Sequence, residues 1–268
     1  MPTRNNITWE LADGVAYVRL DRPKKYNGLT LDMLNELTRL SAQLRREPSL
    51  RAVVLSGSGE SFCSGLDFAS VLHQPQKIVT TFLPRPWRGT NNFQEACWGW
   101  RRLPVPVIAV VHGHVYGGGL QLAMAADFRF TTPDSQWSVL ETKWGLIPDM
   151  TGIRTLAEQV GMDTAKLLTM TGDVVSGTDA HRLGLATSVS DDPHAEAGQL
   201  VDKLLTRSPD AVAAAKRLFN QTWTSSVRRT FHRERLEQLL LLSLRNTAAA
   251  RNAAFKKETP RFAARLLK

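Results

Sequence analysis

Three consecutive glycines, Gly117–Gly119, lie between two apolar runs. We predict a strand at 107–111 and a helix that begins near Leu120. Glycine lets a substrate approach the backbone closely, and the first turn of a helix has N–H groups without partners inside the helix. Such amides bind an anion, or negative charge that develops during a reaction. A tight strand-to-helix turn would give the same pattern, so a second observation is needed.

Two further stretches carry groups that suit the same chemistry. FCSGLD (62–67) follows an apolar run and a Ser/Gly turn, and it offers Gly65 with backbone amides beside it. ETKWGLIPDM (141–150) supplies two carboxylates, Glu141 and Asp149. Two amide-donating loops and two carboxylates are the groups needed to stabilise an enolate while a proton moves next to a carbonyl.

These stretches resemble the crotonase family, the enoyl-CoA hydratase/isomerase superfamily. The resemblance implies an α/β fold, a crotonase-type spiral of ββα turns with a helical C-terminal region. It places an acyl-CoA site in a core at 1–200 and an oligomerisation region at 201–268, and it implies a homotrimer or a dimer of trimers. The stretches that carry it follow in order: LDRPKKYNGLT (20–30), FCSGLD, HGHVYGGGLQLAMAAD (112–127), WSVLETKWGLIPDMTG (137–152), TGDVVSGTDAHRLGLA (171–186) and SPDAVAAAKRL (208–218).

The resemblance assigns the oxyanion-hole amides to Leu66 and Gly118. Family hydratases use two glutamates, one matching Glu141 and the other at the position of Gln121. Glutamine cannot act as a carboxylate base, although it can orient water or a polar substrate group. An ordinary amide that caps a nearby backbone group is the alternative interpretation of Gln121.

Asp149 matches the aspartate used by family members that isomerise dienoyl-CoA. The same position holds the nucleophile of aryl-CoA dehalogenases, which also use a histidine ahead of the glycines. No histidine lies near Gln94, so dehalogenation is not expected. Alternatively, Asp149 caps the helix that follows it.

The resemblance also indicates residues that bind coenzyme A or line the acyl region, although the two lysines among them could be solvated turn residues. No cofactor is expected, because coenzyme A is part of the substrate, and we predict no metal site. The indicated residues are Lys24, Lys25, Ser64, Gly65, Asp67, Phe68, Tyr116, Gly117 and Pro148.

Composition limits the class of protein. No apolar run is long enough to span a bilayer, so no membrane partner is expected. The N-terminal residues lack an apolar signal core, and two cysteines cannot build a disulfide framework, so we predict a cytoplasmic protein. The net charge of +9 is dispersed along the chain, which does not favour nucleic acid. Cys63 is expected to pack rather than react.

Local patterns predict several elements. A hairpin is expected at 7–20 and a helix after an N-cap at Thr30. A strand is expected at 52–55, and helices at 179–183, 193–206 and 225–244. The segment 68–104 holds several tryptophans, which fit either an acyl pocket or the core.

The sequence therefore favours an acyl-CoA enzyme that isomerises a double bond with Glu141 and Asp149. Hydration of a 2-enoyl-CoA, with Glu141 as acid/base and Gln121 positioning water, is the alternative. A catalytically weak acyl-CoA- or nucleic-acid-binding module is a further one.

Overall fold

A six-stranded sheet forms the centre of the computed structural model, which describes residues 6–85 and 87–267. The first two strands are antiparallel, and every later pairing in this sheet is parallel. Asp13 and Gly14, both with positive φ, make the turn of the predicted hairpin. In spatial order the strands are β1 (Ile7–Ala12), β2 (Val15–Leu20), β3 (Ala52–Gly57), β4 (Val107–Val111), β6 (Phe128–Thr131) and β9 (Ser188–Val189).

A second sheet of three short strands lies beside the first. Its strands are β5 (His114–Tyr116), β7 (Gln136–Ser138) and β8 (Val175–Ser176). Strand β5 was not predicted, because three residues are too few to show a clear alternation of apolar and polar side chains. Helix α5 (Gly118–Met124) follows it directly, so the helix begins two residues before the predicted start.

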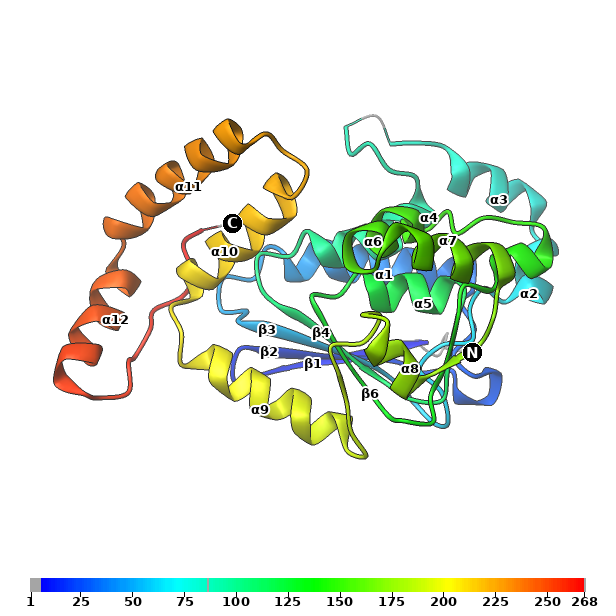
Figure 1. Ribbon diagram of the computed structural model, residues 1–268, viewed down its shortest axis with the longest axis horizontal. Helices are drawn as coiled ribbons and strands as arrows, with labels where there is room; N and C mark the ends of the chain where they lie inside the picture. The colour runs from blue at the N-terminus through cyan, green and yellow to red at the C-terminus, as the bar shows by residue number, and fades with distance from the viewer. Residues whose placement is uncertain (1–5, 86, 268) are drawn as a thin grey trace, which may run out of the picture.

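Helices cover both faces of the large sheet (Figure 1). On one face lies α1 (Leu31–Leu44), whose predicted cap is confirmed because the Thr30 hydroxyl accepts a hydrogen bond from Met33 N at 3.2 Å. Its leucines are buried in the main core. On the other face, α9 (Pro193–Leu205) contributes Ala197 and Val201 to a smaller core.

The segment 68–104 folds into three helices, α2 (Phe68–Leu72), α3 (Pro75–Phe82) and α4 (Asn92–Arg101). Trp100 is fully buried in the core, whereas Trp87 is 81% exposed. Helices α6 (Gly152–Gln159) and α7 (Met162–Thr171) lie between β7 and β8 in the chain, and α8 (Gly177–Arg182) follows β8. The short 3-10 helices are η1 (Pro23–Lys25) and η2 (Leu140–Trp144).

Three helices at the C-terminal end project to one side of the molecule (Figure 1). They are α10 (Pro209–Thr222), α11 (Val227–Leu242) and α12 (Arg245–Lys256). The predicted helix at 225–244 is therefore confirmed as α11. Residue 200, the predicted boundary between core and C-terminal region, lies inside α9. Residues 1–5 and 268 of those two predicted regions lie outside the described residues, and residues 1–5 are half of the N-terminal stretch that lacks an apolar signal core. No helix within the described ranges is long and apolar enough to cross a membrane.

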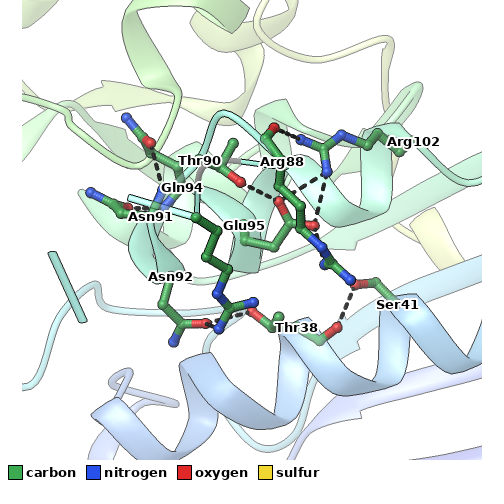
Figure 2. A network of polar contacts seen from close by, with 10 residues as sticks. Thr38, Ser41, Arg88, Thr90, Asn91, Asn92, Gln94, Glu95 and Arg102 are labelled. Carbon is green, nitrogen blue, oxygen red and sulfur yellow. Dashed lines mark hydrogen bonds and ion pairs between the residues drawn. The ribbon is translucent and has the colours of Figure 1, made fainter. Parts of the chain in front are cut away.

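A buried carboxylate lies in the first turn of α4. Glu95, 3% exposed, accepts hydrogen bonds from Arg88, Arg102 and Thr90, and Figure 2 shows these side chains converging on it. At the same end of the helix, Asn92 accepts a hydrogen bond from the Thr38 hydroxyl of α1 at 3.2 Å. The Glu95 contacts tie α4 to the segment before it and to its own C-cap residue, and the Asn92 contact holds α4 against α1. From this position α4 packs Phe93 against Phe82 of the neighbouring α3.

Candidate active site

Backbone hydrogen bonds bring the FCSGLD loop beside strand β5. Cys63 N donates to His114 O at 3.0 Å, and Tyr116 N donates to Cys63 O at 3.0 Å. On the other side of the loop, Leu29 pairs with the residues that flank Leu66, because Leu29 N donates to Gly65 O at 2.8 Å and Asp67 N donates to Leu29 O at 2.9 Å. Within the described chain, the Leu66 amide has no acceptor.

Two glycines allow this close approach. Gly65 has φ +97°, and a Cβ built on it would lie 2.9 Å from Tyr116 O and 3.7 Å from Gly118 N. A Cβ on Gly119 would lie 2.4 Å from Cys63 O. No larger residue fits at either position without separating the loop from α5.

The second amide belongs to the first residue of α5. Gly118 N finds no acceptor among residues 6–85 and 87–267, as expected for the first turn of a helix. Leu66 and Gly118 both line a cavity of about 340 Å³. The structure thus brings the two predicted oxyanion-hole residues to one cavity, with amide groups that no protein acceptor occupies.

Glu141 lies in η2, against the first glycine of the triplet. A Cβ on Gly117 would be 3.3 Å from Glu141 Oε1, so this glycine leaves room for the carboxylate. Gln121 Nε2 donates to the same oxygen at 2.6 Å. The other oxygen, Oε2, is buried without a hydrogen-bond partner in the described structure. Burial raises the pKa of Glu141, and the negative charge of Asp149 adds to this, while hydrogen bonds from its own amide and from Gln121 oppose the shift.

Gln121 joins two parts of the site. Its side chain is almost fully buried, and its Oε1 accepts a hydrogen bond from Gly152 N, the first residue of α6, at 2.8 Å. The amide therefore satisfies the start of α6 and holds Glu141 at the same time. The alternative interpretation is confirmed, since Gln121 caps a backbone group. The orientation of water or of a polar substrate group by Gln121 stays a prediction.

Asp149 is half-buried and lines the same cavity. Burial raises its pKa, although a hydrogen bond from its own amide opposes the shift. The alternative that Asp149 caps the next helix is wrong, because α6 begins after Thr151 and has no side-chain cap. Asp149 therefore has no capping role at α6. Together with Glu141 it gives the cavity two carboxyl groups, both with raised pKa.

The other predicted binding residues separate into two groups. Ser64, Gly65, Phe68 and Gly117 line the cavity. The remaining five do not: Lys24, Lys25, Asp67, Tyr116 and Pro148.

Local contacts explain the second group. Asp67 pairs with Arg22 at 2.7 Å and caps α2; burial favours its neutral form, but these contacts outweigh it and lower its pKa. The Tyr116 hydroxyl bonds to Gln136, so the prediction that Tyr116 lines the acyl region is not supported. Pro148 is buried without reaching the cavity wall.

Most of the cavity wall consists of apolar side chains that were not predicted as site residues. The tryptophans of segment 68–104 are absent from the described wall, which takes aliphatic and phenyl side chains from the same segment instead. A signal was present, since Ile78 and Phe82 are four residues apart in a helix that starts at Pro75. The residues missed are Val71, Leu72, Ile78, Phe82, Phe93, Leu140, Trp144, Leu146, Ile147 and Met150.

Cys63 is a packing residue, as predicted. It is fully buried, its Sγ lies 3.2 Å from Asn27 O, and burial raises its pKa to about 12. Such a thiol is protonated at neutral pH and unreactive. Within the part of the chain that the structure describes, no group of three or more His, Cys, Asp or Glu side chains could hold a metal ion.

Comparison with known proteins decides the family. The family model for enoyl-CoA hydratase/isomerase matches residues 10–262. The chain belongs to the enoyl-CoA hydratase/isomerase family. It is therefore an enzyme of that family with a crotonase-type α/β fold, as the resemblance implied.

Relatives of this family member are named for different reactions. An (E)-benzylidenesuccinyl-CoA hydratase of Thauera aromatica is 30% identical over 214 residues, 78% of this chain and 80% of that protein. A mitochondrial Delta(3,5)-Delta(2,4)-dienoyl-CoA isomerase of Dictyostelium discoideum is 26% identical over 261 residues, covering 92% and 87%. The crystal structure of an enoyl-CoA hydratase from Bacillus anthracis has a TM-score of 0.87 and 26% identity, covering 96% and 99%.

The Gly118 amide can be removed without removing the helix. Proline is tolerated in the first turn of a helix but has no N–H. We expect Gly118→Pro to lower turnover about 10²- to 10³-fold, the usual effect of losing one oxyanion-hole donor. Gly118→Ala is the matched control, because it adds a Cβ that meets the flexible Met150 side chain but keeps the amide. Equal turnover of the two folded variants would contradict the assignment.

The Gln121 amide stabilises the ionised form of Glu141, so its removal has a defined pH effect. Gln121→Met removes a hydrogen bond that lowers the Glu141 pKa, and this pKa then rises further. Because a general base must be ionised, we expect the acid limb of kcat/KM to move to higher pH. Gln159→Met is the control, since Gln159 Nε2 bonds to Met124 O instead. An acid limb that shifts equally in both variants, or in neither, would show that Gln121 does not act on Glu141.

Proposed function

We propose that this protein isomerises a double bond in an unsaturated acyl-CoA. Glu141 and Asp149 transfer the protons, and the Leu66 and Gly118 amides hold the thioester oxygen. The observation that carries the proposal is the presence of two carboxyl groups with raised pKa in one cavity with two unoccupied amides. A raised pKa brings a carboxyl group closer to the pH at which it can both accept and donate a proton.

The geometry suggests how the steps divide. The thioester carbonyl gains negative charge when a neighbouring proton is removed, and two amide donors stabilise that enolate. Glu141 Oε1 is held by Gln121, so Oε2 is the atom available for proton transfer. One carboxylate takes the proton from the acyl chain, and the other returns a proton at a more distant carbon. The double bond moves and the overall composition of the substrate is unchanged.

Hydration of a 2-enoyl-CoA is the second candidate, and the name of the Thauera aromatica relative favours it. In this chain, however, the Gln121 oxygen already accepts the Gly152 amide, and the Gln121 nitrogen faces Glu141. Glu141 alone would then have to activate the water and supply the proton. We prefer isomerisation because both ends of the Gln121 amide already make hydrogen bonds within the protein. The two carboxyl groups in the cavity also disfavour a module that only binds its ligand.

Coenzyme A is proposed as part of the substrate, with Lys24 and Lys25 near its phosphate groups. Both lysines are exposed in η1. A Cβ on Gly28, just after η1, would lie 3.5 Å from Ser64 Oγ, so η1 lies beside the FCSGLD loop that contains Leu66. A lysine ammonium at that place can bind a phosphate without reaching into the cavity.

We also propose a homotrimer or a dimer of trimers. Helices α10 and α11 and the turn between them expose large apolar side chains that a monomer would leave in water: Phe219, Trp223, Val227, Phe231 and Leu239. Exposed patches of this kind mark interaction surfaces. We expect sedimentation at micromolar concentration to show a trimer or hexamer, and a single 29.8 kDa species would contradict the proposal.

The two candidate reactions make different demands on Asp149. If isomerisation is correct, Glu141→Gln and Asp149→Asn each lower turnover by about 100-fold or more, the usual contribution of a general acid or base. In a hydratase, Asp149→Asn leaves most activity intact. The amide keeps the shape of the side chain, and circular dichroism checks the fold. Turnover of Asp149→Asn above about a third of wild type, a loss of under about 1 kcal/mol, would contradict the two-carboxylate mechanism.

A further inference from the structure

Among the residues that the structure describes, no positively charged side chain lines the cavity beyond the two amides. Its lining within the described residues has two ionisable side chains, Glu141 and Asp149, and no lysine, arginine or histidine. Nearly all the rest of the wall is apolar. A positive partner for a charged acyl group is therefore missing from the wall, although the chain as a whole has a net charge of +9.

Aromatic and aliphatic side chains from separate elements build the apolar wall. Phe82 of α3 packs on Phe93 of α4 with ring centroids 4.7 Å apart, and Phe68 of α2 packs on Trp144 of η2 at 5.1 Å. Ile78 of α3 lies on the same wall. The cavity volume of about 340 Å³ is in the range of pockets that enclose whole small-molecule ligands. A four-carbon acyl group would leave much of this wall uncovered.

A carboxylate carried by the acyl group would be unfavourable here for two reasons. It would lose its water against hydrocarbon without gaining a hydrogen-bonded cation, and such burial is costly. It would also share a cavity of low dielectric with Glu141 and Asp149, whose negative charges repel it. An uncharged chain avoids both costs, and each apolar group that it buries contributes favourable binding.

We infer that the substrate carries an uncharged, bulky apolar acyl group, a chain of about eight carbons or more or an aromatic ring, and that α3 selects it through Ile78 and Phe82. This inference rests on the proposed acyl-CoA function and adds a substrate class to it. Short acyl groups and acyl groups with an acidic end are poor substrates.

Three thioesters test the inference with the wild-type protein. They are a ten-carbon unsaturated acyl-CoA, the same chain ending in a carboxylate, and a four-carbon acyl-CoA with the same double bond. Mass and ultraviolet spectra identify the products. We expect kcat/KM for the neutral ten-carbon substrate to exceed that for the carboxylated one by at least about 100-fold. We expect it to exceed that for the four-carbon substrate by at least about tenfold.

Adjacent residues of α3 provide a matched pair of variants. Ile78 is half-buried in the cavity wall, whereas Val79 is 64% exposed and lies outside that wall. Ile78→Arg places a guanidinium where it can pair with an acidic chain end. We expect it to raise kcat/KM for the carboxylated thioester at least about tenfold and to lower that for the neutral one. Val79→Arg adds the same charge to the same helix, and we expect it to leave kcat/KM for both thioesters unchanged.

The outcomes separate this inference from the proposed function. A wild-type protein that turns over the carboxylated or the four-carbon thioester as well as the neutral ten-carbon one overturns the inference and leaves the acyl-CoA activity standing. Equal effects of Ile78→Arg and Val79→Arg overturn the role of α3. Failure to turn over any thioester in a wider panel overturns the proposed function, and the inference with it. Even if Ile78→Arg does not fold, the comparison of thioesters with the wild-type protein tests whether an uncharged acyl group is preferred to a carboxylated one.

Discussion

The site depends on the close approach of two backbone segments. The carbonyl oxygen of Cys63 lies 2.4 Å from the position that a Cβ of Gly119 would take, and the missing Cβ of Gly65 likewise leaves space for Tyr116 O. This contact brings the Leu66 and Gly118 amides to one cavity, although the two residues are more than fifty positions apart in the sequence. Pairing of the loop with β5 on one side and Leu29 on the other then keeps the amides in place.

Groups whose position follows from local backbone geometry were predictable from the sequence. The three glycines predicted the strand–helix junction, and the Thr30 cap predicted the start of α1. The choice of Gly118 within the triplet came from the family resemblance. The apolar wall was not predictable in this way, because Ile78 and Phe82 acquire their role when α3 packs against α4. Asp149 was ambiguous for a related reason, since a carboxylate after a proline looks like a cap until the helix is seen to begin after Thr151. For Tyr116, a side-chain contact with Gln136 outweighed what the sequence position suggested.

The neutral amide of Gln121 meets two requirements of the site at once, one for an acceptor and one for a donor. The start of α6 needs an acceptor for Gly152 N, and Glu141 needs a donor that leaves one oxygen uncommitted. A glutamine side chain has both groups at its end, whereas a carboxylate in the same place would bring a second negative charge against Glu141. One residue, Gln121, thus both caps the start of α6 and lowers the pKa of Glu141.

The apolar rim of the cavity has a thermodynamic consequence. Leu72, Trp144 and Ile147 are largely exposed although they belong to the wall of the site, so water covers hydrocarbon at the entrance in the free protein. An acyl chain that enters removes this surface from water. Removal of apolar surface from water makes the heat-capacity change of binding negative, so the binding enthalpy becomes more favourable as the temperature rises. Calorimetry at several temperatures measures this heat-capacity change.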